Sequence, residues 1–113
     1  MVNKSYTPNR RDIIWIDFNP THGHEQSNVR PALVLSEKAY NQKTHLAVVC
    51  PITSQVKGHN FEVLINELKI TGAILSDHVR SLDWSTRNIR FIQKASLDVF
   101  NEVEEKLSTL LFG

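Results

Sequence analysis

The chain has 113 residues, of which 41% are hydrophobic and 22% charged, and its formal net charge is +1. A chain of this length buries roughly two-thirds of its extended surface on folding, so we expect one domain over residues 1–113. The lone Cys50 excludes an internal disulfide, and no stretch approaches the ~20 apolar residues of a membrane span. We therefore expect a protein of the reducing cytoplasm with neither a signal peptide nor a membrane anchor.

The charges are unevenly distributed along the chain. From Ser96 to the C-terminus four acidic residues accompany Lys106, whereas the first 95 residues carry 12 bases against 8 acids. A basic body permits an anionic ligand such as nucleic acid, although mixed solvated surfaces often reach this excess by chance.

Six short segments rich in β-branched and aromatic residues predict strands. They are residues 12–18, 31–36, 46–52, 61–65, 73–79 and 89–93. Polar or glycine-containing segments separate them, which is typical of a small curled antiparallel sheet or barrel.

The end of the chain changes to a helical period. Apolar residues from Leu97 to Leu111 recur at helical spacing with acidic and polar residues between them, which predicts an amphipathic helix over residues 96–111. Ser96 is a suitable N-cap, and Asp98 in the first turn complements the helix dipole. The expected fold is therefore mainly β, with one C-terminal helix.

Two long polar segments, residues 19–30 and 53–60, interrupt the strands, and loops of this length in a small domain often carry function. In the first, Glu25 and Arg30 stand five residues apart. A guanidinium matches phosphate oxygens, and a carboxylate can accept a proton or orient a hydroxyl. A solvated surface ion pair is the simpler interpretation of the same two residues.

Hydroxyl and cationic side chains mark two further places. Thr53 and Ser54 follow a predicted strand and could bind a phosphate, although such residues more often form turns. Strand alternation over residues 77–81 would place Asp77 on one face and His78 and Arg80 on the other, as a small cationic edge.

The histidines suggest two hypotheses. His22 and His24 could bind zinc, but no second cluster of ligands at suitable spacing follows, and we expect neither a metal nor another cofactor. His24 paired with His59 or His78 could instead perform acid–base chemistry on RNA.

Several segments in order along the chain resemble the MazF/PemK family of toxin endoribonucleases. They include Gly-x-Glu-Gln ahead of Arg30-Pro31 and the Asp-x-Val-Arg-Ser run that starts at Asp77. The matching segments are residues 11–21, 23–26, 30–36, 51–54, 57–58 and 72–83, together with the acidic closing helix.

The resemblance implies a small SH3-like barrel related to the CcdB toxin, acting as a homodimer. Such proteins cut single-stranded RNA without metal by attack of the ribose 2′-hydroxyl, and a cognate antitoxin neutralises them with an acidic tail in the RNA groove. It implies catalytic roles for Glu25, Arg30 and Thr53. The RNA contacts that we expect are His24, Gln26, Ser54, Lys57, His59, Asp77, His78 and Arg80.

Two alternatives belong to other functional classes. One is a non-catalytic CcdB-like toxin that binds a protein such as gyrase, which would not need the set Glu25, Arg30 and Thr53. The other is an SH3-like adaptor for proline-rich peptides, which would need an exposed aromatic groove.

Overall fold

The computed structural model describes residues 6–19 and 28–113, and it has a strand in each of the six predicted segments, together with elements that the sequence did not predict. The elements are β1 (Asp12–Asp17), β2 (Val29–Val34), α1 (Lys38–Thr44), β3 (Leu46–Thr53), β4 (Glu62–Glu67), β5 (Ile70–Leu75), β6 (Arg80–Asp83), the 3-10 helix η1 (Trp84–Thr86), β7 (Arg90–Lys94) and α2 (Leu97–Phe112). In the part of the chain described, no helix is long and apolar enough to cross a membrane.

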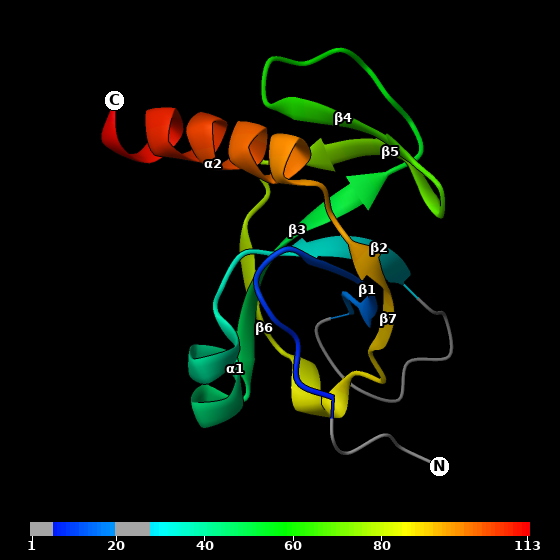
Figure 1. Ribbon diagram of the computed structural model, residues 1–113, viewed down its shortest axis with the longest axis vertical. Helices are drawn as coiled ribbons and strands as arrows, with labels where there is room; N and C mark the ends of the chain where they lie inside the picture. The colour runs from blue at the N-terminus through cyan, green and yellow to red at the C-terminus, as the bar shows by residue number, and fades with distance from the viewer. Residues whose placement is uncertain (1–5, 20–27) are drawn as a thin grey trace.

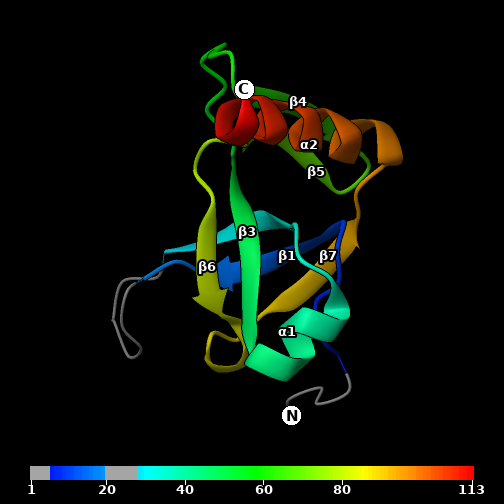
Figure 2. The ribbon, with the colours of Figure 1, turned by 90° about the vertical axis from the view of Figure 1, so that its left-hand side faces the viewer.

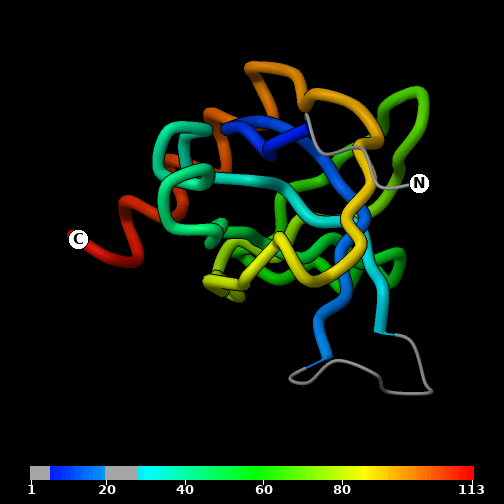
Figure 3. Tube along the Cα trace, turned by 90° about the horizontal axis from the view of Figure 1, so that it is seen from below, coloured from blue at the N-terminus to red at the C-terminus, as the bar shows by residue number. Residues whose placement is uncertain are grey.

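All strand pairs are antiparallel, and the main path of the sheet runs β4-β5-β3-β2-β1-β7, with β6 pairing β3 away from this path. Figure 2 shows β3 running along the molecule from the α1 end to the α2 end. Figure 3 shows β1 and β2 side by side in blue and cyan, as their register requires. The predicted antiparallel barrel with a C-terminal helix is confirmed as a strongly curled sheet.

Strand alternation divides the buried side chains into two clusters. Ile13 belongs to a cluster with Leu33 and with Phe100 and Val103 of α2, while its neighbour Ile14 belongs to the second cluster. Because successive strand residues point to opposite faces, a strand that is apolar at every position supplies both clusters.

The predicted C-terminal helix is confirmed. The Ser96 hydroxyl accepts a hydrogen bond of 3.2 Å from the amide of Val99, which satisfies one of the unpaired donors at the start of α2. Figure 1 shows α2 beside β4 and β5 at the end of the molecule opposite α1. Phe100 and Val103 are buried, whereas Leu111 and Phe112 are exposed.

Helix α1 was absent from the sequence prediction because it has no apolar face. Its one buried residue is Asn41, whose amide nitrogen donates to the carbonyl oxygens of Pro8 at 2.9 Å and Ser36 at 3.0 Å. The indole nitrogen of Trp84 donates to the Asn41 carbonyl at 3.0 Å. A polar network holds this helix, and hydrophobic periodicity does not reveal such a network.

The predicted strand over residues 73–79 is wrong at its end. β5 stops at Leu75, and a separate strand, β6, begins at Arg80. Ser76 is buried and bonds the Phe61 carbonyl through both its amide and its hydroxyl, and the amide of His78 donates to Leu75 at 3.0 Å. These bonds turn the chain, so Asp77, His78 and Arg80 do not alternate on one strand.

Candidate functional site

A pocket of about 510 Å³ lies between the first residues of β2 and the last residues of β3. β1 and β5 contribute the remaining walls. The lining residues are Trp15, Arg30, Pro31, Ile52, Thr53, Ser54, Gln55, Ile70 and Thr71. Three of the residues singled out from the sequence, Arg30, Thr53 and Ser54, therefore share one pocket.

The register of the strands explains why Arg30 and Thr53 meet. β2 and β3 pair as far as Ala32 opposite Pro51, and two residues further in the same register Arg30 would stand opposite Thr53. The pairing of β2 with β3 ends at Pro51, while the other edge of β3 pairs with β5 through Thr53 and Ala73. β2 and β3 separate there, and the pocket occupies the space between Arg30 and Thr53.

Both side chains keep hydrogen-bond donors available to a ligand. Arg30 is exposed, and its Nε donates to the side-chain oxygen of Asn28 at 2.9 Å, which orients the guanidinium. Among residues 6–19 and 28–113 its other N–H groups have no partner and can bind an anion. The Thr53 hydroxyl accepts from the amide of Gln55 at 3.1 Å, so its own proton can be donated into the pocket. A phosphate group fits this pair of donors.

Gly72 allows β5 to approach the end of β3. Its φ is +152°, and a Cβ at this position would overlap the carbonyl oxygen of Thr53. Glycine is required here both by the conformation and by the space, so the position of Thr53 depends on it.

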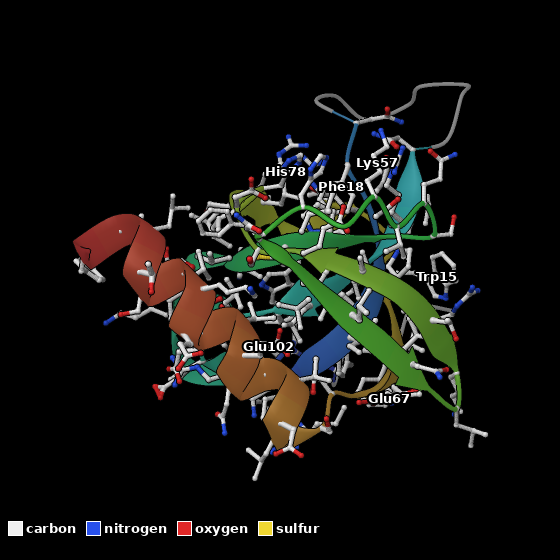
Figure 4. All side chains as sticks on the ribbon, turned by 90° about the horizontal axis from the view of Figure 1, so that it is seen from above. Trp15, Phe18, Lys57, Glu67, His78 and Glu102 are labelled. Carbon is white, nitrogen blue, oxygen red and sulfur yellow. The ribbon has the colours of Figure 1, made fainter. Side chains whose placement is uncertain are left out.

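A cationic face lies beyond the pocket: it carries the charges of Lys57 and Arg80, and it also includes the side chains of His78 and Phe18. The Arg80 guanidinium carbon is 5.5 Å from the centre of the Phe18 ring, and its Nη1 donates to the Phe18 carbonyl at 3.3 Å. Figure 4 shows Lys57, Phe18 and His78 on one side of the molecule and Glu102 of α2 on the other. Glu102 of the acidic helix thus lies away from the cationic face.

Main-chain hydrogen bonds fix the loop that carries Lys57. The carboxylate of Glu62 accepts from the amides of Lys57 at 3.1 Å and Gly58 at 2.9 Å, and the His59 carbonyl accepts from the Glu62 amide at 3.1 Å. The side chains of Lys57 and His59 are exposed, as RNA contacts must be. Asp77 and His78 are exposed as well, with His78 Nε2 3.8 Å from Asp77 Oδ1.

Three of the predicted site residues, Glu25, His24 and Gln26, lie outside the described residues. Over residues 6–19 and 28–113, no three His, Cys, Asp or Glu side chains gather as a metal site would require. Cys50 is buried, and burial raises the pKa of its thiol to about 12, so it is a neutral core residue as expected.

Comparison with known protein families identifies the family of this chain. The family model described as "PemK-like, MazF-like toxin of type II toxin-antitoxin system" matches residues 9–111. The chain belongs to this family. The resemblance seen in the sequence motifs is thereby confirmed.

Curated relatives and solved structures agree with this MazF-like assignment. The endoribonuclease toxin MazF of Escherichia coli K12 is 37% identical over 98% of this chain and 99% of its own. The endoribonuclease PemK of Escherichia coli is 32% identical over 98% and 87%. The crystal structure of MazF from Deinococcus radiodurans superposes with a TM-score of 0.85 at 46% identity, covering 94% of this chain and 97% of that one. A MazE-MazF crystal structure from the same organism gives a TM-score of 0.84 at 42% identity, covering 95% and 97%.

The MazF-like site also contains residues that the sequence did not single out. Trp15, Gln55 and Thr71 line the pocket, and Phe18 supports Arg80. Trp15 stands in a run of apolar strand residues, so the sequence pattern did not distinguish it from core residues. Its neighbours Ile14 and Ile16 are indeed fully buried.

Arg87 is a further residue that the sequence did not indicate in this MazF-like chain. Its Nη1 donates to the carbonyl oxygens of Asp17 at 2.9 Å and Asn19 at 2.6 Å. It therefore fixes the main chain at the end of β1, next to Phe18 on the cationic face.

Proposed function

We propose that this chain is an endoribonuclease toxin that cuts single-stranded RNA, chiefly mRNA in the cytoplasm, and so inhibits translation and growth. The observation that carries the proposal is the shared pocket of Arg30 and Thr53, where two strands separate and leave hydrogen-bond donors for a phosphate. The names of the full-length relatives as endoribonucleases support the activity.

The proposed reaction is an attack of the ribose 2′-hydroxyl on the adjacent phosphorus. A new P–O2′ bond forms, the bond to the 5′-oxygen of the next nucleotide breaks, and the departing 5′-oxygen takes up a proton from solvent. The products carry a 2′,3′-cyclic phosphate and a 5′-hydroxyl. Arg30 would stabilise the negative charge that grows on the phosphorane, because its guanidinium stays protonated and matches two oxygens at once. Thr53 would donate a hydrogen bond to a non-bridging oxygen. No step requires a metal ion.

The attacking hydroxyl must lose a proton, and we assign this task to Glu25. The assignment comes from the Gly-x-Glu-Gln motif of the family, and Glu25 could equally serve by holding Arg30 in place. In either role, loss of the carboxylate would slow the chemical step more than it weakens RNA binding.

The cationic face gives the RNA chain a path away from the pocket. Lys57, His78 and Arg80 are exposed there, and Ser54 and His59 lie in the loop beside them. We assign RNA contacts to these residues and to His24, Gln26 and Asp77. Contacts with phosphates make binding depend on salt, because each one displaces bound counterions.

A cognate antitoxin would occupy the same cationic face. The Deinococcus structures of relatives with MazE support an antitoxin partner. An acidic antitoxin tail would compete with RNA for Lys57, Arg80 and Arg30, since both ligands are anionic.

We also propose that the working unit is a homodimer. The last turns of α2 expose Leu110 at 46%, Leu111 at 64% and Phe112 at 84%. Clustered apolar residues at a helix end are typical of an interface between protomers.

The test is cleavage of a long single-stranded RNA in the presence of EDTA, followed by analysis of the new ends. We expect 2′,3′-cyclic phosphate and 5′-hydroxyl ends, and no cleavage where a 2′-deoxyribose precedes the scissile phosphate. Intact RNA, a need for a divalent metal, or 3′-hydroxyl ends would contradict the proposal. Binding without cleavage would favour the CcdB-like alternative.

A further inference from the structure

Trp15 forms part of the pocket wall, and the proposed chemistry gives it no role. It lies on β1 between Pro31 of β2 and Arg90 of β7, its register partners. Ile13, two residues earlier on the same face of the strand, is fully buried, whereas Trp15 is only half-buried. An aromatic ring in the middle of the sheet thus remains accessible from the pocket that Arg30 lines.

The walls next to Trp15 are apolar, and the rim is polar. Pro31, Ile52 and Ile70 line the pocket together with the indole. The exposed residues Ser54, Gln55 and Thr71 bring hydroxyl and amide groups to its mouth. The side-chain amide of Gln55 and the hydroxyl of Thr71 have no hydrogen-bond partner among the described residues, so both can bond a ligand.

This combination suits a nucleobase. Single-stranded RNA is recognised by stacking its bases on aromatic rings and by hydrogen bonds to the edges of the bases. An apolar peptide side chain would make no hydrogen bond to the polar rim, whereas the edge of a base would. Pockets of about 300–1,000 Å³ enclose small organic ligands, so there is room for a base.

The place of the pocket relative to Arg30 indicates which base enters. Arg30 and Trp15 line the same pocket, so a phosphate on Arg30 leaves the base of an adjoining nucleotide within reach of Trp15. We propose that this pocket binds one base next to the scissile phosphate, with Trp15 as the stacking platform and Gln55 and Thr71 as the residues that select the base. The inference rests on the proposed RNA cleavage and deepens it.

The intrinsic tryptophan fluorescence of the chain can report binding at the pocket. It contains two tryptophans, and Trp84 lies apart from the pocket in η1, hydrogen bonded to Asn41 of α1 and 6.2 Å from the His45 ring. In Trp84→Phe the fluorescence comes from Trp15 alone, and in the matched control Trp15→Phe it comes from Trp84 alone. The ligand is an RNA of the cleaved sequence with a 2′-deoxyribose at the scissile nucleotide.

We expect saturable quenching in Trp84→Phe and no change in Trp15→Phe. Replacing the nucleotides by abasic ones in turn should abolish the quenching at a single position beside the scissile phosphate. Unchanged Trp15 fluorescence on binding of the RNA, or quenching that no abasic position removes, would overturn the base subsite.

The second measurement concerns base selection. Gln55→Ala and Thr71→Ala should relax the preference at that same position at least fivefold, judged by sequencing the ends cut from a randomised RNA pool. Ser85→Ala, in η1, is the control and should keep the preference. An unchanged preference in both pocket variants would remove Gln55 and Thr71 from base selection. A wild-type protein that leaves RNA uncut would instead refute the proposed function itself.

Discussion

Gly72 of β5 lies so close to the carbonyl of Thr53 at the end of β3 that a Cβ on Gly72 would overlap the Thr53 oxygen. This contact holds β5 against the part of β3 that has left β2. The opening between Arg30 and Thr53 therefore depends on a residue that has no side chain and takes no part in the chemistry.

Replacing Gly72 by alanine should displace Thr53 and destabilise the fold. We expect a loss of about 2 kcal/mol or more, because a backbone atom blocks the new methyl group and the positive φ adds strain. Gly58→Ala is the matched control, since Gly58 also has a positive φ (+80°) but open space around it. Urea unfolding of both variants is the measurement, and equal losses would contradict the argument from close approach.

Arg30→Ala should fold normally and lose RNA cleavage. Removing one contact to the transition-state charge costs ~3 kcal/mol, on the order of 100-fold in rate. Arg30→Lys should also be slow, because an ammonium lacks the planar fork. The control is Arg10→Ala, which removes an exposed arginine whose Nε donates to Leu35 at the far end of β2. Single-turnover cleavage within a few-fold of wild type for Arg30→Ala would exclude the assignment.

Lys57→Gln should weaken RNA binding and make it less sensitive to salt. One lost phosphate contact lowers the slope of log affinity against log salt by ~0.7 for a single strand. Lys43→Gln removes an exposed charge from α1, away from the cationic face, and should leave the slope unchanged. Titrations at several salt concentrations measure both slopes, and equal slopes would remove Lys57 from the RNA path.

The buried thiol should make stability fall in alkaline solution. Burial raises the pKa of Cys50 from 9.0 to about 12, so above pH 9 the unfolded chain releases this proton while the folded chain keeps it. The contribution is complete below pH 9 and is lost as the pH rises toward 12. Cys50→Ala should therefore show a smaller decline in urea midpoint between pH 8 and pH 10.5 than wild type. Parallel declines would show that the Cys50 thiol has the same pKa in the folded and the unfolded chain, which would contradict the effect of burial.

The exposed end of α2 should control self-association. Leu111→Glu combined with Phe112→Glu introduces charges into the apolar cluster and should convert the dimer to a monomer at micromolar concentration. Leu68→Glu is the control, because Leu68 is 95% exposed in the turn between β4 and β5. Sedimentation velocity distinguishes the species. A wild-type protein that is already monomeric and fully active would refute the dimer.

Much of the architecture could be predicted from local pattern. The β-branched run at Ile13 and Ile14 predicted β1, and the helical spacing after Ser96 with its cap predicted α2, because burial of one face imposes a period on the sequence. Helix α1 and the turn at Ser76 escaped prediction because hydrogen bonds of Asn41 and Ser76 hold them, and such bonds leave no periodic trace.

The candidate site, too, could be predicted only in part from the sequence. The sequence alone determined the residue types: Arg30 closes one polar loop, Thr53 opens another, and their motifs indicated a family. Only the tertiary structure decided that β3 leaves β2 after Pro51, which opens a pocket between Arg30 and Thr53 and adds Trp15 to its wall. The reason is physical, since alternation along a strand is a local property, whereas the register and separation of strands depend on contacts between residues far apart in the chain.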